Sequence, residues 1–473
     1  MKLENIDIDQ TIQTVKQMLE KEEGLSPALR SSLELLLLLI TLLINRLGLN
    51  SGNSSKPPSS DPNRKKIKKP TGKRKPGGQT GHNGTTLKKA SDPDIVKNIK
   101  IDRSTLPKGK YRELDPETRQ VIGIDITKVV TEFRAQVLEN QHGKRYIAEF
   151  PKEVTRPVQY GDSVKAHAVY MSQYQLIPYQ RIEDHFEDQM QIPVSAGSLY
   201  NFNEDAYQRL EEFEQIVKSK LIRSKLVHSD ETGININGKG HWLHCASNDQ
   251  WTFFYPHQRR GSIAMDEMGV LPNFKGVLCH DHWKSYFRYE CSHSLCNAHH
   301  LRELERAWEQ DGQKWAKKLQ TLLIEINQTV KDANGQLNQT DSMKFRKKYR
   351  LILKKGEKET PPPEVKDRKG SRGRIPKSKS RNLLERLIDF EKETLRFMDN
   401  TNVPFTNNLG ENDIRMTKVH QKISGCFRSM KGAEFFCRIR SYLSTCRKND
   451  MGSSEALNLL FKGQLPTFIN PAE

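Results

Sequence analysis

The stretch Lys225–Ala246, KLVHSDETGININGKGHWLHCA, constrains the fold of this chain more than any other. Its first residues form an apolar run of strand length, and the acidic pair Asp230 and Glu231 follows at the expected C-terminal end of that strand. A turn rich in Gly and Asn then leads into a second predicted strand, His241–Ala246. A carboxylate at the end of a buried strand is held with its oxygens outward, which suits a hard divalent cation. Taken alone, an acidic residue at such a position is more often simply solvated.

The charge balance indicates a polyanionic partner. The chain has 77 Lys and Arg against 58 Asp and Glu, a formal net charge of +19. This excess favours binding to nucleic acid, although a ribosome or a membrane surface would require the same sign. With 473 residues the chain is expected to contain several modules rather than one core. Its seven cysteines all follow residue 244 without the spacing of a disulfide framework, which favours a reducing cytoplasm.

The N-terminal region is predicted to be helical. Apolar residues spaced three and four apart within Thr11–Glu22 indicate an amphipathic helix, and Ser26, followed by proline, is placed to cap a second one. Leucine lies on nearly every face of Leu29–Leu47, so this helix needs partners all round, either in another copy or in a hairpin within one subunit. Leu33–Ile44 is too short to span a bilayer, and the polar Met1–Glu23 predicts no secretory signal.

A basic arm follows the N-terminal helices. Within Gly48–Lys89 the composition changes to Ser, Pro, Gly, Asn and Lys, which cannot form a core. Between Lys56 and Lys89 eleven residues are basic, and Asp61 is the only acid. Such an arm can follow a phosphate backbone without reading its sequence, and we favour this interpretation over a solubilising linker. The predicted phosphate contacts are Lys65, Lys66, Lys68, Lys69, Lys73, Arg74 and Lys75.

Two regions without evident catalytic residues come next. Ser91–Lys152 is polar with two predicted strands, Val121–Ile126 and Lys128–Gln136. Tyr160–Leu221 is predicted to be helical, with a break before Ser195, which is placed to cap the next helix. Two helices joined by a short turn resemble a helix-turn-helix, but helical pairs are common, so DNA reading and plain packing are equally weighted here.

A second aspartate follows a second buried run. The elements expected after the opening strand pair are the strand Trp251–His257, the helix Arg260–Met268, the strand Phe274–His280, the strand Cys291–Leu295 and a helix from Ala298. This is the order of the RNase H-like fold, in which the first and fourth strands can lie side by side and bring Asp230 and Asp281 together. Two close carboxylates repel each other unless a cation lies between them, and a pair of Mg²⁺ ions would supply phosphoryl-transfer chemistry.

Glu411, in PFTNNLGENDIRMTKVH, is the third candidate ligand. Asn408 can cap a helix whose third residue is Glu411, so a capping box explains this glutamate without any catalytic role. The same helix places Glu411, Arg415 and Lys418 along one face. A carboxylate aligned with two cations suits a metal-bound phosphodiester, whereas the alternative is an ordinary salt-bridged surface helix.

Six motifs resemble successive signatures of the insertion sequence 66 family of bacterial transposases. In chain order they are NSGNSSKPPSSD, KRKPGGQTGH, HSDETG, VLCHDHWKSYF, CNAHHLREL and NNLGENDIR, and the resemblance extends from about Leu47 to Asp450. It implies an RNase H-like catalytic core with an Asp-Asp-Glu triad formed by Asp230, Asp281 and Glu411. It also selects Asp230 over Glu231, between which the strand pattern does not decide, and it implies a helical insertion at Trp308–Phe397.

The chain departs from the family in one respect. The family often carries a cysteine-rich zinc ribbon after the basic arm, and because Ser91–Lys152 has no cysteine, a Cys₄ zinc site is excluded there. Cys296 and His299 are separate candidates for zinc. Their spacing is not that of a standard finger, so we favour a packed strand-to-helix junction over a metal site at this point.

The resemblance implies a transposase of the Asp-Asp-Glu type that cuts transposon ends and joins the freed 3′-hydroxyl to target DNA. Two Mg²⁺ ions, with Mn²⁺ as a substitute, would be held by the triad, and Arg415 and Lys418 would bind phosphates. Its expected partners are double-stranded DNA, a second copy in a synaptic complex and accessory proteins of the same element, in the bacterial cytoplasm at the nucleoid and not in a membrane. Two alternatives are an inactive transposase-derived DNA-binding protein and an RNase H-like structure-selective nuclease.

The expected fold class is α/β multidomain, an RNase H-like mixed-sheet core with a helical insertion, preceded by helical N-terminal and DNA-binding regions. The predicted divisions are 1–48 for oligomerisation or packing, 49–90 for the basic arm, 91–155 for a small β-rich region, 156–222 for the helical region, 223–450 for the catalytic core with its insertion at about 308–397, and 451–473 for the tail.

Overall fold

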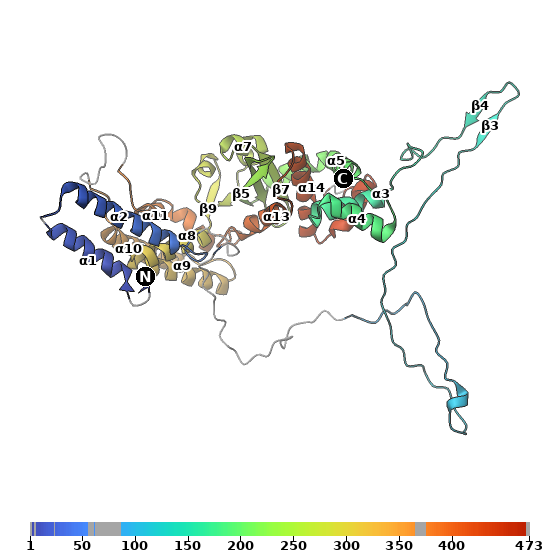
Figure 1. Ribbon diagram of the computed structural model, residues 1–473, viewed down its shortest axis with the longest axis horizontal. Coiled ribbons are helices and arrows are strands. Elements are labelled where there is room, and N and C mark those ends of the chain that lie inside the picture. The colour runs from blue at the N-terminus through green and yellow to red at the C-terminus, as the bar shows by residue number, and fades with distance from the viewer. Residues whose placement is uncertain are drawn as a thin grey trace.

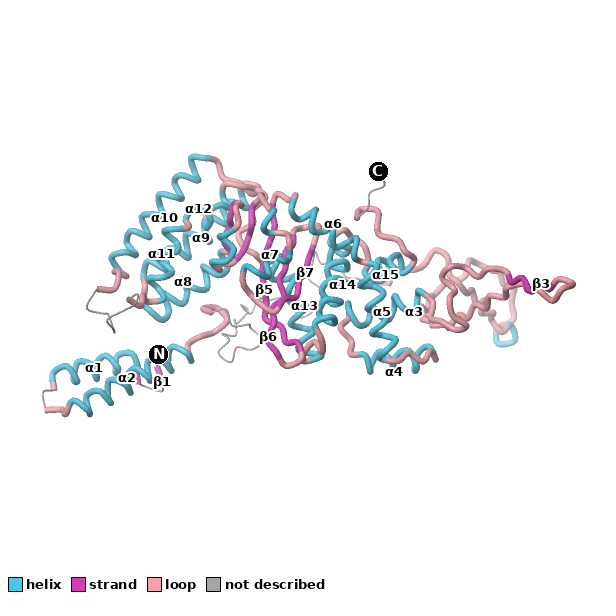
Figure 2. Tube along the Cα trace, turned by 90° about the horizontal axis from the view of Figure 1, so that it is seen from above, coloured by secondary structure: helices cyan, strands magenta, loops and turns pink. Residues whose placement is uncertain are grey.

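The computed structural model describes residues 2–3, 6–22, 24–54, 61, 87–364 and 375–469. Figure 1 shows a mixed sheet at the centre, with a helical bundle and the N-terminal hairpin on one side and a second group of helices on the other. The view from above in Figure 2 gives the same arrangement. The fold is therefore mixed α/β, as predicted, whereas the divisions between domains stay predictions.

The N-terminus forms a helical hairpin, α1 (Ile8–Lys21) and α2 (Pro27–Leu47), after the short pair β1 (Lys2–Leu3) and β2 (Ile6–Asp7). The predicted cap is confirmed, because Ser26 Oγ accepts a hydrogen bond from the Leu29 amide at 3.3 Å. The hairpin leaves most leucines of α2 exposed, while Leu37 is buried. Within the described residues, Pro27–Ile44 is the one segment long and apolar enough to cross a membrane, a test that core helices of soluble proteins and signal sequences also pass.

The region after the basic arm contains little regular structure. Its described elements are η2 (Arg103–Thr105) and the antiparallel pair β3 (Val137–Glu139) and β4 (Arg145–Ile147), and it extends away from the other elements in both views. The predicted strands Val121–Ile126 and Lys128–Gln136 are wrong, because both segments lie outside any strand. Apolar and β-branched residues favour a strand only where a neighbouring strand pairs with them.

The predicted helical region is confirmed. It comprises α3 (Asp162–Val169), the π-helical turn η3 (Tyr170–Tyr174), α4 (Tyr179–Met190), α5 (Ala196–Arg209) and α6 (Glu211–Ile222). Gln191 ends α4 in a left-handed conformation, and Ser195 caps α5 by accepting a hydrogen bond from the Ser198 amide at 3.2 Å. The helix, turn and capped helix are therefore present as predicted.

The central sheet has five strands in the order β7-β6-β5-β8-β9. They are β5 (Leu226–Ile236), β6 (Lys239–Ser247), β7 (Thr252–His257), β8 (Val277–His280) and β9 (Ser292–Leu295). The first three pair antiparallel, whereas β8 pairs parallel to both β5 and β9. The short helix α7 (Ser262–Met268) and the turns η4 (Leu271–Asn273) and η5 (Lys284–Arg288) connect them.

The opening strand is longer than its sequence predicts. It continues through Asp230 to Ile236, and the turn lies at Asn237 and Gly238, which both have positive φ angles of 48° and 79°. The expected end of the strand at Asp230 is therefore wrong. Alternation of apolar residues resumes beyond it because Ile234 and Ile236 pack on the core, and the two-residue Asn-Gly turn suits the twist of a hairpin. Only Leu226–His228 pair with β8, so Asp230 lies just past the end of the parallel part of β5.

A helical bundle separates β9 from the last catalytic candidate, as predicted for the insertion. Its members are α8 (Asn297–Asp311), α9 (Lys314–Asp332), α10 (Gln339–Glu359), α11 (Lys379–Asp389), α12 (Glu391–Thr394) and the turn η7 (Arg396–Met398). They share a core of their own, in which Trp315, Leu323 and Tyr349 are fully buried. The insertion thus has its own core, against which Leu226 of β5 and Val277 of β8 also pack.

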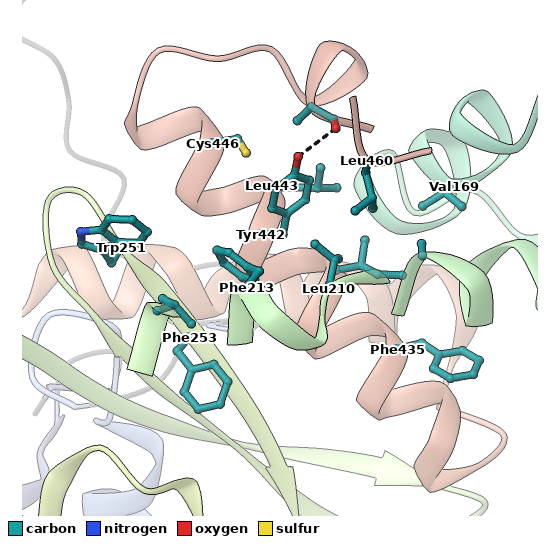
Figure 3. Close-up of a cluster of buried hydrophobic side chains, with 14 of the residues drawn as sticks. Val169, Leu210, Phe213, Trp251, Phe253, Phe435, Tyr442, Leu443, Cys446 and Leu460 are labelled. Carbon is teal, nitrogen blue, oxygen red and sulfur yellow. Dashed lines mark hydrogen bonds between the residues drawn. The ribbon is translucent and has the colours of Figure 1, made fainter. Parts of the chain in front are cut away.

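Two of the last three helices, α13 (Asn408–Ser424) and α14 (Met430–Lys448), pack on the sheet, whereas α15 (Ser453–Phe461) packs on α3 and α14. Figure 3 shows the largest core, where Phe213 of α6 and Phe253 of β7 lie near Tyr442 of α14, whose hydroxyl donates to the Ala456 carbonyl at 2.8 Å. A smaller core packs Ile414 of α13 against Ile234 and other apolar residues of β5 and β6. This second core holds α13 against the strand that carries Asp230.

Candidate active site

Asp230 lies at the centre of the sheet on the face that α13 covers. It pairs with Cys245 of β6, and its Oδ1 accepts a hydrogen bond from the Glu231 amide at 2.9 Å. Burial, followed by the nearby charges of Glu231, Glu411 and Asp281, raises the pKa of Asp230 to about 8. A buried carboxylate with three acidic neighbours is unfavourable in its charged form unless a cation compensates for them.

Asp281 reaches the same place from β8. This strand ends at His280, and Asp281 turns away from the sheet with its Oδ1 accepting a hydrogen bond from the Trp283 amide at 2.8 Å. Because β8 runs parallel to β5, its C-terminal end lies beside the part of β5 that leads to Asp230. The charge of Asp281 raises the pKa of both Asp230 and Glu231, so the two strands bring these carboxylates within range of one another.

Glu411 lies in the first turn of α13, and both ends of this helix are attached to β5. At the start, Asn407 accepts a hydrogen bond from His228 Nδ1 at 2.7 Å and donates one to the Ser229 carbonyl at 2.9 Å. After the helix, Phe427 donates a backbone hydrogen bond to the Asn235 carbonyl at 2.9 Å and accepts one from the Asn237 amide at 2.8 Å, at the end of β5 and in the β5–β6 turn. These contacts fix the helix along the strand, where the charge of Glu411 is near enough to raise the pKa of Asp230.

The predicted cap of this helix is wrong. Asn408 is its first helical residue. The preceding Asn407 makes no side-chain cap, because its side-chain amide forms hydrogen bonds with β5 instead. The capping-box explanation of Glu411 therefore does not hold. Asn407 is a positioning residue that sequence reasoning missed; the adjacent pair of asparagines was the available signal, and nothing local tells which of the two faces the strand.

The candidate residues supply the donors that a divalent cation needs. Asp230 lies in the middle of the sheet, Asp281 follows the end of β8, and Glu411 lies on α13, which covers the sheet face. All three side chains are only partly exposed. Carboxylate oxygens are the ligands of Mg²⁺ and Mn²⁺. Burial and the neighbouring carboxylates raise the pKa of Asp230, so a bound cation would favour its charged form. The donor types therefore fit a divalent metal, whereas the ligand atoms that lie within 4.8 Å of one another, among the described residues, are those of Cys296, His299 and Glu411.

Glu231 points to the opposite face of β5 and is already neutralised there. Its carboxylate accepts two hydrogen bonds from Arg260, at 2.9 and 2.7 Å, and one from the buried Tyr286 hydroxyl. The side chain is 1% exposed, and the guanidinium of Arg260 lies over the rings of Trp242 and Trp283 at 4.8 and 4.4 Å. This packed network, which sequence reasoning missed because its members are far apart in the chain, makes Glu231 a structural partner.

The two predicted phosphate-binding cations differ in their surroundings. Arg415 is exposed and forms no hydrogen bond or ion pair with any residue that the structure describes. Lys418 instead donates to the Gly233 carbonyl at 2.6 Å and to Gln421 at 3.3 Å, and burial lowers its pKa. Arg415 is thus the cation of α13 that remains available beside Glu411, whereas Lys418 also ties the helix to β5.

Cys296 and His299 lie directly beside Glu411. One oxygen of this carboxylate is 3.7 Å from Cys296 Sγ and 3.8 Å from His299 Nδ1, and the three ligand atoms all lie within 4.8 Å of one another. Cys296 also accepts a hydrogen bond from the Asn407 amide at 3.2 Å. The strand-to-helix junction is packed, and together with the third triad candidate it forms a group of potential metal ligands.

The expected DNA-binding regions are only partly visible. The arm residues Lys65, Lys66, Lys68, Lys69, Lys73, Arg74 and Lys75 lie outside the described part of the chain. In the predicted helix-turn-helix, the groove between α4 and the turn at residues 193–195 is lined on its α4 side by Glu183, Asp184 and Glu187. These acidic side chains would repel a phosphate backbone, so packing is the better interpretation of this helix pair.

Comparison with known families agrees with the resemblance seen in the motifs. A model of the Transposase IS66 family matches residues 157–435, which include the sheet, the insertion and all three triad candidates. A second model, described as a family of unknown function (DUF6444), matches residues 3–88, which include the N-terminal hairpin and the basic arm. A search of curated proteins found no match.

Proposed function

Because this chain belongs to the IS66 family of transposases, we propose that it is an Asp-Asp-Glu transposase that cuts DNA at the ends of its element and joins the 3′-hydroxyl to target DNA. The observation that carries the proposal is the position of Asp230. It lies at the centre of the sheet, near Asp281 and Glu411, with a pKa of about 8 that marks a site built for a cation. An acidic cluster of this kind suits metal-assisted phosphoryl transfer.

The sheet supports assignment to the RNase H-like fold. Its order β7-β6-β5-β8-β9, with three antiparallel strands followed by two parallel ones, is the order expected from the sequence for that fold. In this arrangement the first and fourth strands are neighbours, and α13 covers the face on which Asp230 lies. The proposed catalytic core is 223–450, with the helical bundle inserted between β9 and α13.

The proposed metal complement is two Mg²⁺ ions, with Mn²⁺ able to substitute, held by Asp230, Asp281 and Glu411. When bound, such ions activate the attacking oxygen and stabilise the leaving one in an in-line displacement. The chain's own residues set the geometry: Asn407 and the β5–β6 turn fix α13, and the Trp283 amide orients Asp281. No nucleophilic side chain is required, so no covalent protein–DNA intermediate is part of the proposal.

DNA would be held by cations around this face and by the basic arm. Arg415 projects from the same helix as Glu411 and is free to bind a phosphate that flanks the scissile bond. In the bundle, α10 carries further exposed lysines that form no ion pair with any described residue: Lys347, Lys354, Lys355 and Lys358. Contacts of this kind supply affinity without reading sequence.

Synapsis of two ends requires at least two copies, and we propose that α2 provides part of that interface. Its leucines are exposed on several sides although α1 packs beside it. A helix with this distribution is stable in water only when other helices cover it. We also propose that the protein acts in the cytoplasm with accessory proteins encoded in the same element.

The test uses the full-length chain, the DNA that flanks its gene and the neighbouring gene products. We expect cleavage at inverted repeats in Mg²⁺ and, with a pre-cleaved end, joining to target DNA. Asp281→Ala should abolish both reactions and leave DNA binding intact, whereas Asp413→Ala, which removes a partner of Lys448 nearby, is the matched control. Residual Mg²⁺-dependent cleavage by Asp281→Ala would refute the assignment.

Two other functions give different outcomes in the same assay. A structure-selective nuclease would cut but never join a pre-cleaved end. An inactive DNA-binding protein derived from a transposase would shift the DNA in a gel and cut it in neither Mg²⁺ nor Mn²⁺. The intact set of three carboxylates favours the transposase over both.

A further inference from the structure

We infer that Cys296, His299 and Glu411 form a site for Zn²⁺ that shares a ligand with the proposed catalytic centre. Cys296 precedes α8, His299 lies in its first turn, and Glu411 comes from the first turn of α13. Two helix starts that are far apart in the sequence therefore present a thiol, an imidazole and a carboxylate to one point.

The separations are close to those that a bound zinc ion requires. Zinc binds sulfur at about 2.3 Å and nitrogen or oxygen at about 2.0–2.2 Å, so tetrahedral ligand atoms lie about 3.3–3.6 Å apart. The distances from Glu411 Oε1 are 3.7 Å to Cys296 Sγ and 3.8 Å to His299 Nδ1. Small rotations of the side chains would bring these atoms to bonding distance, without movement of the backbone.

The ligand atoms are not committed to other strong partners. His299 Nδ1 is buried and has no hydrogen-bond partner among the described residues, and its nearest acidic group is Glu411. Cys296 is 1% exposed, and its sulfur accepts a hydrogen bond from the Asn407 amide at 3.2 Å, a bond that stabilises a thiolate and that a metal-bound sulfur can keep. A buried polar atom without a partner is rare and indicates a missing ligand or a functional role.

The chemistry of the donors selects zinc rather than magnesium. A thiolate and an imidazole are preferred by Zn²⁺, whereas Mg²⁺ requires oxygen ligands and retains its water. With three protein ligands, a fourth position stays open to water. The buried thiol of Cys296 must give up its proton to the solvent when the metal binds, so binding releases a proton.

The shared glutamate links this site to catalysis, a consequence that rests on the proposed function. A carboxylate oxygen bound to zinc is withdrawn from the pair formed by Asp230 and Asp281. Zinc at this site should therefore inhibit the Mg²⁺-dependent reaction, and removal of the thiol should relieve the inhibition. The binding of zinc itself does not depend on which reaction the protein catalyses.

The direct test is a zinc titration of the metal-free full-length chain by equilibrium dialysis. We expect one zinc per chain at this site, with affinity at least about 100-fold weaker in Cys296→Ser. The matched control is Cys291→Ser, which removes another partly buried thiol, 3.9 Å from His293, and should leave zinc binding unchanged. Equal zinc binding by wild type and Cys296→Ser, or none in either, would overturn the inference.

A second variant and a second readout guard against loss of folding. His299→Asn should also lose the ion, and its far-ultraviolet circular dichroism should match that of the wild type. With Co²⁺ as probe, a sulfur-to-metal charge-transfer band should appear in wild type and Cys291→Ser and vanish in Cys296→Ser. If zinc binds as expected while no variant or wild-type protein cleaves DNA, the zinc site stands and the transposase proposal fails.

Discussion

Replacing Asp230 by asparagine is predicted to stabilise the metal-free protein near neutral pH and to remove its response to Mg²⁺. The change keeps the size of the side chain and removes the charge that its acidic neighbours oppose. Because the folded-state pKa is raised from 3.8 to about 8, the folded protein holds a proton that the unfolded chain releases. This carboxyl therefore lowers the free energy of unfolding as the pH rises from about 4 to 8, and the loss levels off above that range.

The magnitude follows from the size of the shift. One pKa unit corresponds to about 1.4 kcal/mol, and pH 7 lies about three units above the ordinary pKa, which gives an upper value of about 4 kcal/mol. The asparagine amide keeps part of the desolvation cost of this buried position, so we expect a gain of about 2–4 kcal/mol for Asp230→Asn at pH 7. For a domain of about 200 residues this raises the melting temperature by roughly 5–10 °C.

Thermal unfolding in a chelator between pH 5 and pH 8 measures this effect. The difference between Asp230→Asn and wild type should grow with pH, and saturating Mg²⁺ should stabilise only the wild type. The matched substitution Asp413→Asn should instead destabilise the protein, because it leaves Lys448 without the carboxylate 2.7 Å away. An Asp230→Asn variant that is no more stable than wild type at any pH would refute the electrostatic reasoning.

Three further predictions concern packing and DNA contacts. In Gly276→Ala the new Cβ would lie 2.6 Å from a backbone carbonyl oxygen, so the free energy of unfolding, measured by denaturant titration, should fall by at least about 3 kcal/mol. Gly233→Ala places its Cβ in open space and should leave the free energy of unfolding unchanged. Equal stability of the two variants would contradict this prediction. Asn407→Ala leaves His228 and a backbone carbonyl without hydrogen-bond partners, so the free energy of unfolding in the same assay should fall by about 2–4 kcal/mol. Because α13 is then less firmly held, most of the strand-transfer activity should also be lost. Arg415→Ala should leave the melting temperature unchanged. It should reduce the magnitude of the slope of log binding constant against log salt concentration by about one, and an unchanged slope would exclude a phosphate contact.

Much of the core was predictable because its signals are local. The apolar runs around Val227 and Leu278, the cap at Ser195 and the proline after Ser26 each specify an element within a few residues. The sequence could not give the true end of β5, because the strand continues only where α13 and β6 bury Ile234 and Ile236. The strands expected at Val121–Ile126 fail for the opposite reason, since no partner strand reaches them.

The candidate site was only partly predictable. Motif resemblance predicts Asp230, Asp281 and Glu411 as the triad, which stays a prediction, and the strand order explains how the first two approach each other. The contacts that orient the third, made by Asn407 across the sheet, depend on the packing of residues about 180 positions apart. The strand pattern alone could not separate Asp230 from Glu231; the resemblance selects Asp230, and the fold gives the physical reason, because Glu231 is paired with Arg260.

Anomalous diffraction from crystals of the full-length chain grown with Mn²⁺ tests directly whether the three carboxylates bind a metal. We expect manganese bound by Asp230 and Asp281, with Glu411 as a further ligand, and no such peak in crystals of Asp230→Asn. Manganese found only at other residues, or a wild-type site empty at saturating Mn²⁺, would contradict the claim that these three carboxylates form a metal centre.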